Sequence, residues 1–378
     1  MNAIPFTEIR NWMFAHALPF WGSAGLDHAH GGFHEELTLA GAPADLPFKR
    51  VRVTCRQIYV FSHAALLGWG EGAALAERGY RYLTDKAWQG EGRGWARRLT
   101  REGAVLDPTA DLYDTAFALH ALAWHYRLTH SEDARARMHA TLDFVHTHMR
   151  PEGGAGFWHQ LPPTGPRLQN PHMHLLEASI AAFEATADER FLDQAGEIVG
   201  LFRRCFFDGR TLGEYFNADW SRVSGEMGRR VEPGHQFEWA WILAQYQRLK
   251  GVDLIAEASA LVDFAERHGV DAETQMTYDE VRDDGAPLRK TSRTWPNTER
   301  LKGHLALFEH ARRDTRAEIA SAARALLDRY LAVKPRGSWI DQFDEQGAPL
   351  AATAPASTLY HVFLAFAEAL RLEPKLSA

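Results

Sequence analysis

The sequence has few cysteines, no long apolar run and no excess of positive charge. Cys55 and Cys205 are its only cysteines in 378 residues, too few for a disulfide framework or a cysteine-rich zinc site. No stretch approaches the roughly 20 apolar residues that cross a bilayer, and the start MNAIPFTEIRNW does not resemble a signal peptide. The net charge of −7 argues against a surface for nucleic acid or anionic membranes. We therefore expect a cytoplasmic globular protein with neither of these partners.

Histidine and tryptophan, in contrast, are abundant, with 19 and 12 residues respectively. Histidine titrates near neutral pH and serves as acid, base or metal ligand. Tryptophan offers a flat apolar wall with one hydrogen-bond donor. The two counts together favour a cleft lined by both residue types, although most single histidines are expected to be ordinary surface or packed residues.

Six short segments share one pattern of Gly, an aromatic residue, alternating residues and a polar turn, which is typical of a short β-hairpin. They recur at intervals of roughly 60 residues, which indicates an internal repeat. The segments are GGFHEELTLAGAP (31–43), GWARRLTREGAVLD (94–107), GFWHQLPPTGP (156–166), GEYFNADWSRVSG (213–225), QMTYDEVRDDGAP (275–287) and GSWIDQFDEQGAP (337–349).

Helical stretches, mostly in pairs, lie between these segments, with apolar residues at three- and four-residue spacing. The first helix of a pair, such as 112–128, is apolar on nearly all sides, whereas the second, such as 131–149, has one charged face. A helix that is apolar all round is buried, and an amphipathic one lies outside it. We predict one all-α (α/α)6 barrel of about twelve helices, spanning residues 1–378 as a single domain, with the hairpins at one end. The alternative is an open helical solenoid, which would need polar capping repeats that the apolar last helix does not provide.

Parallel inner helices would place all their N-termini around one end of the barrel. Helix N-termini present unpaired N–H groups and a partial positive charge, so this end suits anionic or hydroxyl-rich ligands. Each predicted inner helix carries polar residues in its first turns, a recurrence that favours a functional site over six unrelated buried polar groups. These residues are Arg52, Arg56, Asp111, Tyr113, Asp114, Asn170, His172, His174, Glu177, His235, Glu238, Trp295, Glu299, Tyr360 and His361.

Two of these positions pair a histidine with a carboxylate three residues later, His174 with Glu177 and His235 with Glu238. Residues three apart lie on one helix face, and a carboxylate beside an imidazole fixes its tautomer and raises its basicity. A base of this kind moves protons efficiently at neutral pH.

Competing motifs are weak. His28, His30 and His34 cluster before the first helix of the barrel without the H-E-x-x-H spacing of a zinc site, and no dinucleotide fingerprint or phosphate-binding loop is present. We therefore expect no metal and no cofactor.

Five segments resemble one known family, the N-acylglucosamine 2-epimerases and related sugar isomerases. They occur in the family's order and at its spacing, and the resemblance covers nearly the whole chain. The family's fold is an (α/α)6 barrel, and its members move the proton on the carbon next to a sugar carbonyl. The segments are CRQIYVFS (55–62), NPHMHLLEA (170–178), PGHQFEWAW (233–241), WPNTE (295–299) and LYHVF (359–363).

The resemblance implies that His235 and His361 form the acid/base pair. It also implies that a sugar is bound by Arg56, Asn170 and His174, and that Glu238 and Glu299 hold the histidines and the sugar hydroxyls in place. Tyr113 and Trp295 occupy the same level of the inner helices and complete the expected substrate-binding set, which is Arg56, Tyr113, Asn170, His174, Glu238, Trp295 and Glu299.

The preferred hypothesis is an aldose–ketose isomerase of unphosphorylated monosaccharides, converting D-mannose to D-fructose through an enediolate. A sugar 2-epimerase is the alternative, because two histidines would also serve proton transfer on opposite faces of one carbon. A glycoside hydrolase would need two carboxylates about 5 to 10 Å apart, for which Asp111 and Glu299 are candidates. A sugar-binding module would have no use for the two bases. We expect a monomer or a homodimer.

Overall fold

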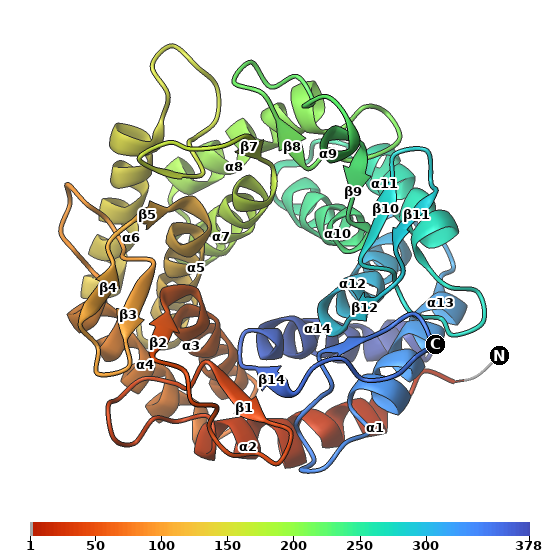
Figure 1. Ribbon diagram of the computed structural model, residues 1–378, viewed down its shortest axis with the longest axis horizontal. Helices are drawn as coiled ribbons and strands as arrows, with labels where there is room; N and C mark the ends of the chain where they lie inside the picture. Colours follow the sequence, from red (N-terminus) through yellow and green to blue (C-terminus); the bar gives the residue numbers. More distant parts are fainter. Residues whose placement is uncertain (1–2) are drawn as a thin grey trace.

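The computed structural model describes residues 3–378, which form two concentric rings of helices (Figure 1). Each helix of the inner ring follows a short strand or a turn at the same end of the molecule and runs away from it. The predicted (α/α)6 barrel is thereby confirmed. The inner helices are α3 (Val51–Leu66), α5 (Leu112–Thr129), α7 (Asn170–Thr186), α10 (Pro233–Lys250), α12 (Thr294–His310) and α14 (Thr358–Leu376).

The outer ring alternates with the inner one along the chain, and several of its rods contain a π-helical turn. Such turns interrupt the regular i→i−4 hydrogen bonding locally. A further one-turn helix, α9 (Glu226–Arg229), lies between β8 and β9 and belongs to neither ring. The outer rods are α1–η1–α2 (Phe6–Asn11, Trp12–Ala17, Leu18–Ser23), α4 (Gly72–Lys86), α6–η2 (Glu132–Phe144, Val145–Met149), α8–η3 (Glu189–Leu201, Phe202–Phe206), α11 (Ile255–Gly269) and α13–η4 (Arg316–Ala325, Leu326–Tyr330).

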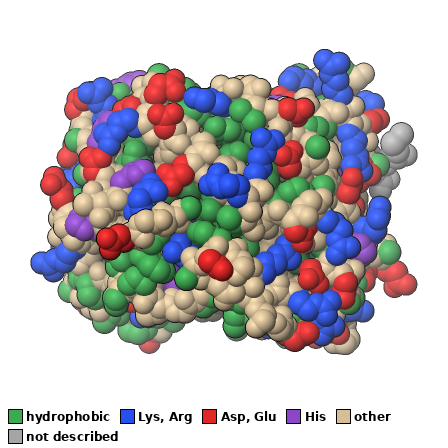
Figure 2. Space-filling view, turned by 90° about the horizontal axis from the view of Figure 1, so that it is seen from above, with side chains coloured by type: hydrophobic (Ala, Val, Ile, Leu, Met, Phe, Trp, Pro, Cys, Tyr) green, Lys and Arg blue, Asp and Glu red, His purple; other side chains and the backbone are tan. Residues whose placement is uncertain are grey.

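Burial follows the hydrophobic pattern that separates the two rings. Helix α5 is buried at nearly every residue from Leu112 to Ala123, because helices pack on it from both sides and from the outer ring. Helix α8 instead buries a stripe that includes Phe191 and Ile198, and it exposes Glu189 and Arg190. The side face of the molecule shows acidic and basic side chains interleaved (Figure 2). In the described part of the chain, no helix is both long and apolar enough to span a bilayer.

The strands join neighbouring repeats instead of forming six separate hairpins. The strand before each inner helix pairs antiparallel with the first strand of the next repeat segment. Five pairs follow this rule along the chain, and a sixth closes the ring. The pairs are β2 (Phe48–Arg50) with β3 (Arg98–Thr100), β5 (Ala110–Asp111) with β6 (Gln160–Leu161), β7 (Arg167–Leu168) with β8 (Tyr215–Phe216), β9 (Arg230–Val231) with β10 (Glu280–Arg282), β12 (Ser292–Arg293) with β13 (Gln342–Phe343), and β14 (Thr353–Pro355) with β1 (Glu36–Thr38).

The hairpin pattern therefore predicted the turns correctly, but it predicted only some of the strand pairs. Two-stranded hairpins form in segments 94–107, where β4 (Val105–Asp107) pairs with β3, and 275–287, where β11 (Pro287–Arg289) pairs with β10. Three other segments fold back through single bridges, such as the one between Leu37 and Pro43. Strands of two or three residues satisfy few backbone groups within one segment, so most of the pairing is made with the adjacent repeat.

The first and last repeats meet, which excludes the open solenoid. Strand β1 pairs with β14 with Leu37 opposite Ala354, and α14 packs on both α3 and α1. In the outer layer the indole of Trp21 stacks on Trp339, with ring centroids 4.7 Å apart, and donates a hydrogen bond to the Gly337 carbonyl at 3.0 Å. Gly337 has φ of +93°, and a Cβ there would lie 2.7 Å from the backbone of His16. The N-terminal rod is thus fixed to the last repeat.

We expect Trp21→Ala to lower the free energy of unfolding by about 3 to 5 kcal/mol, because it removes a fully buried indole and leaves a cavity at the ring closure. Denaturant unfolding followed by circular dichroism would measure the loss. The control, Leu350→Ala, truncates a side chain that is 52% exposed and should change stability by less than about 0.5 kcal/mol. Equal stability of the two variants would contradict this role of Trp21.

Candidate active site

A cavity of about 340 Å³ opens at the strand end of the barrel, where the inner helices begin. Its wall includes residues from the first turns of all six inner helices. Of the nine predicted site residues, eight line it, and Glu299 lies directly behind His361. The eight lining residues are Arg56 (α3), Tyr113 (α5), Asn170 and His174 (α7), His235 and Glu238 (α10), Trp295 (α12) and His361 (α14).

Local sequence explains how the α10 and α12 starts approach each other. Pro233 occupies the first turn of α10, where its missing N–H costs no helical hydrogen bond. The next residue is Gly234, and a Cβ on it would lie 2.5 Å from the ring of Trp295. The indole of Trp295 therefore lies close to both histidines, with ring centroids 5.2 Å from His235 and 5.7 Å from His361. The indole forms an apolar part of the cavity wall beside both imidazoles.

His235 is held by a carboxylate that the sequence did not point to. Its Nδ1 lies 3.0 Å from Glu214 Oε2, and Gln169 lies 3.2 Å away on the same side. Burial disfavours the charged imidazole, but the attraction of Glu214 and Glu232 outweighs it and raises the pKa of His235 to about 10. His235 is therefore an imidazolium at neutral pH, able to donate a proton.

The expected pairing of His235 with Glu238 is wrong. Glu238 makes no hydrogen bond to His235, because Nδ1 of the imidazole faces Glu214 from the neighbouring strand end. The Oε1 atom of Glu238 has no partner within the described residues, although the residue is buried and lines the cavity. Burial and repulsion by Glu299 raise the pKa of Glu238 well above its usual range, which indicates a carboxylic acid that can donate to a ligand.

The protonation state of His361 differs from that of His235. Its Nδ1 lies 2.8 Å from Glu299 Oε1, so the imidazole donates there and leaves Nε2 as the acceptor. Burial lowers the pKa of His361 well below its usual value, and the positive charges of Arg56 and Lys302 lower it further. His361 is thus a neutral imidazole with a free lone pair, which is the form that accepts a proton.

His174 and Arg56 complete the polar wall. The Nδ1 of His174 lies 3.2 Å from Glu177 Oε2, so the i, i+3 pairing holds here, while burial lowers the pKa of His174 to about 4. Arg56 donates to the Tyr113 hydroxyl at 2.7 Å and to the Ser357 carbonyl at 3.3 Å. Its guanidinium also lies over the ring of Phe117, at 4.3 Å, which fixes the cation in a desolvated position.

The mouth of the cavity contains charged residues that sequence reasoning missed. Arg50 is hydrogen-bonded to Glu35 at 2.6 Å, and Arg293 is hydrogen-bonded to Asp279 at 2.9 Å. Each guanidinium at the mouth is therefore already engaged by a carboxylate. The mouth also includes the carboxylates of Glu36, Glu232 and Asp341.

Other polar residues of the first turns have structural partners. Arg52 donates three hydrogen bonds to Asp114, two of them from its guanidinium, and Asp111 caps α5 by accepting from the backbone of Tyr113 and Asp114. His172 is fully buried and bonds to the backbone of Leu168 and Phe157. These side chains shape the helix starts and do not line the cavity.

Three buried groups bring histidine and carboxylate atoms within 4.8 Å of one another, as a metal site would require. In each group the histidine Nδ1 is already engaged by a carboxylate of the protein. Among the described residues, none of these groups includes His28, His30 or His34. The groups are His174 with Glu177 and Glu238, Glu214 with Glu232 and His235, and Glu238 with Glu299 and His361.

The chain also resembles known proteins over nearly its full length. It is 35% identical to the mannose-6-phosphate isomerase of Rhizobium meliloti (strain 1021), covering 96% of this chain and 95% of the relative. It is 28% identical to the D-mannose isomerase of Thermobifida fusca, covering 86% and 85% respectively. The structure of cellobiose 2-epimerase from Spirochaeta thermophila superposes with a TM-score of 0.87 at 25% identity, covering 99% of this chain and 97% of the other.

The model of the N-acylglucosamine 2-epimerase family matches residues 31–365, a range that includes both histidines and every inner helix start. The relatives are sugar isomerases and 2-epimerases, which agrees with a cavity that holds one protonated and one neutral imidazole. The chain therefore belongs to the N-acylglucosamine 2-epimerase family of sugar isomerases and epimerases.

Proposed function

We propose that the protein is an aldose–ketose isomerase of unphosphorylated monosaccharides that converts D-mannose to D-fructose. The observation that carries this proposal is the pairing, in one cavity, of a neutral His361 with a protonated His235 beside Trp295. The relative at 35% identity is named mannose-6-phosphate isomerase and the one at 28% is named D-mannose isomerase, and these two isomerase names support isomerisation.

In the proposed mechanism, His361 Nε2 removes the C2 proton of the open-chain aldose and forms an enediolate. His235 and Arg56 stabilise the oxygen that becomes negative, because a protonated imidazole and a guanidinium in a desolvated site interact strongly with developing charge. His235 donates its proton to O1 and takes the proton of the O2 hydroxyl, while His361 returns the C2 proton to C1, which gives the ketose and restores both imidazoles. His174 assists ring opening, while Glu238 and Asn170 hold sugar hydroxyls.

A 2-epimerase is the second candidate, because the same two groups would serve it. His361 would again remove the C2 proton, and His235 would deliver its own proton to the opposite face of C2. Several relatives favour this reaction, among them the cellobiose 2-epimerases of Spirochaeta thermophila and Bacteroides fragilis. The product formed from mannose separates the two, since isomerisation gives fructose and epimerisation gives glucose.

The contacts of the two carboxylates argue against a glycoside hydrolase. Asp111 caps α5, and Glu299 is enclosed by His361 and Lys302, so neither lines the cavity. We further propose that residues 1–378 act as one catalytic domain, as a cytoplasmic monomer or homodimer, without a metal or cofactor.

Replacing either histidine should strongly lower the rate of the reaction. We expect His361→Asn and His235→Asn each to lower kcat/KM for mannose by about 100-fold or more, the usual contribution of a general acid or base. The assay measures fructose and glucose separately. The control is His148→Asn, at an exposed position outside the cavity, which should keep full activity. Glucose formation without fructose would refute the isomerase and support the epimerase.

The charge on His235 predicts an alkaline limit to activity. The imidazolium is lost as pH rises through its pKa of about 10, so kcat/KM should fall there. Glu214→Gln removes the nearest stabilising charge and should move this alkaline limb down by about one pH unit or more. Glu226→Gln, at an exposed carboxylate, is the matched control. An unmoved limb in Glu214→Gln would contradict the role of His235 as an acid.

Sugar phosphates should be poor substrates, although one relative has the name mannose-6-phosphate isomerase. The carboxylates at the mouth repel a phosphate, and Arg50 and Arg293 are already engaged. We expect kcat/KM for mannose 6-phosphate to be roughly tenfold or more below that for mannose. Glu36→Gln, which removes one negative charge at the mouth of the cavity, should reduce the difference in kcat/KM between the two sugars. Faster turnover of the phosphate by the unaltered protein would overturn this prediction.

A further inference from the structure

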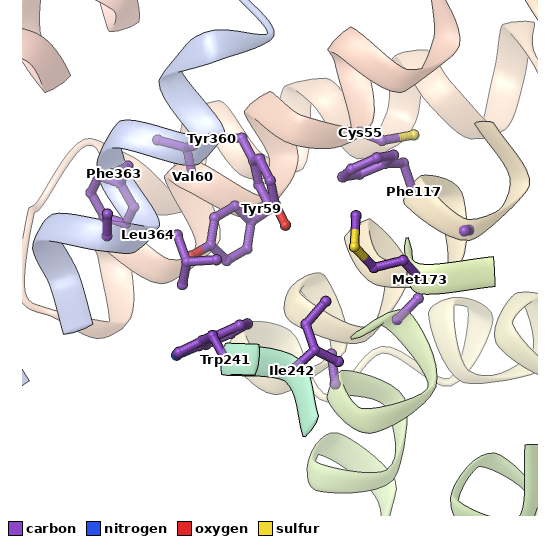
Figure 3. Packing of buried hydrophobic residues seen from close by; sticks show 14 of the residues in the cluster. Cys55, Tyr59, Val60, Phe117, Met173, Trp241, Ile242, Tyr360, Phe363 and Leu364 are labelled. Carbon is purple, nitrogen blue, oxygen red and sulfur yellow. The ribbon is translucent and has the colours of Figure 1, made fainter. Parts of the chain in front are cut away.

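A lysine is fully buried beneath the cavity. The ammonium of Lys302, on α12, lies 2.7 Å from Glu299 Oε2, and both side chains have no exposed surface. The ammonium also lies 4.4 Å from the ring centre of Trp241, which belongs to the buried cluster in the barrel interior (Figure 3). Removing a lysine from water is expensive unless it is paired, so its position requires an electrostatic explanation.

Three carboxylates from neighbouring inner helices attract this cation: Glu299 of α12, which is in direct contact, Glu238 of α10 and Glu177 of α7. Burial disfavours the charged ammonium, but attraction to Glu299, Glu238 and Glu177 outweighs it, and the pKa of Lys302 is raised. Lys302 therefore remains charged. One cation cannot balance three ionised carboxylates. The pKa of Glu177 is lowered, burial raises the pKa of Glu299, and burial with repulsion by Glu299 raises the pKa of Glu238 well above its usual range, so Glu238 is the one that stays protonated.

The carboxylates that contact the two histidines of the cavity differ in their own partners. Each has a carboxylate oxygen at Nδ1, Glu299 at 2.8 Å for His361 and Glu214 at 3.0 Å for His235. Glu299 has the Lys302 ammonium on its other oxygen, whereas Glu214 has no lysine or arginine partner among the described residues. A carboxylate with no cation beside it favours the imidazolium. A carboxylate that is paired with a cation still orients the imidazole ring through the hydrogen bond, but it favours the imidazolium less.

We propose that Lys302 is a positioning residue for the reaction: through its ion pair with Glu299 it keeps His361 uncharged, with Nε2 free to accept the substrate proton. The carboxylate then fixes the tautomer and orientation of the ring, and the ammonium cancels the charge that would otherwise protonate it. Lys302 thus adds to burial and to Arg56 in separating the base from the acid in this cavity. The catalytic consequence rests on the proposed function, while the effect of Lys302 on His361 does not.

Charged and titratable groups face His361 from four inner helices besides its own. Arg56 of α3 opposes the imidazolium, and Glu177 of α7 favours it. The remaining groups include Glu238, whose carboxylate lies in the same group of atoms as Glu299 and His361. These groups are Arg56, His174, Glu177, Glu238, Glu299 and Lys302.

The test is a titration of His361 by nuclear magnetic resonance of histidine labelled with nitrogen-15, assigned with His361→Asn. In the unaltered protein His361 should stay neutral, protonated on Nδ1, from about pH 6 to pH 8. In Lys302→Met, the unbalanced Glu299 should raise the midpoint of the His361 titration by about one pH unit or more. Lys302→Arg, which keeps the charge, should restore the neutral ring. Lys375→Met, at a lysine 63% exposed on α14, is the matched control.

A double variant tests the route through Glu299. Glu299→Gln with Lys302→Met removes both charges, so His361 should titrate as in the unaltered protein. If the double variant shifts as far as Lys302→Met, the effect does not pass through Glu299 and the proposal is overturned. An unshifted His361 in folded Lys302→Met overturns it too, and so does a charged His361 in the unaltered protein, which needs no variant.

Activity gives a separate readout. The acid limb of kcat/KM for mannose should move to higher pH in Lys302→Met, with about tenfold lower activity near pH 6 and recovery at alkaline pH. A merely structural role would lower activity equally at all pH values, and that result would contradict the proposal. Absence of isomerase activity in the unaltered protein would refute the proposed function, while the His361 titration would still test Lys302.

Discussion

The antiparallel pairing of β1 with β14 brings the two ends of the chain together and closes the ring of inner helices. Because each inner helix starts after a strand paired in the same way, the closure sets six helix starts around one opening. Groups 301 residues apart, the guanidinium of Arg56 and the backbone carbonyl of Ser357, thereby come within hydrogen-bonding distance. The cavity and its charges depend on this closure, since an open array of the same helices would not bring α3 against α14.

Burial then determines the chemistry inside the ring. A charge removed from water must be balanced, so each histidine takes the protonation state that its buried neighbours impose. Glu214 and Glu232 favour the imidazolium of His235, whereas Arg56 and Lys302 disfavour that of His361. The two imidazoles are thus distinguished by their surroundings and not by their own chemistry.

The same site geometry explains why the family contains both isomerases and 2-epimerases. Both reactions begin with removal of one proton next to a carbonyl, and they differ in the carbon and face to which a proton returns. Trp295 lies beside both rings, and carboxylates line the same cavity.

Hydrophobic periodicity in the sequence determined the two rings, because a helix packed on all sides must be apolar on all sides. The recurring polar first turns likewise predicted the level of the cavity and eight of its lining residues. Strand partners and the carboxylate of His235 required the tertiary structure. Glu214 lies near a strand end, 21 positions before His235, and no helical spacing links the two. Lys302, three residues after Glu299, fits the pattern of an ordinary helix face in sequence, and only the closed barrel shows that it is buried among three carboxylates. Sequence patterns report which face of an element is apolar, whereas the balance of buried charge depends on contacts between elements far apart in the chain.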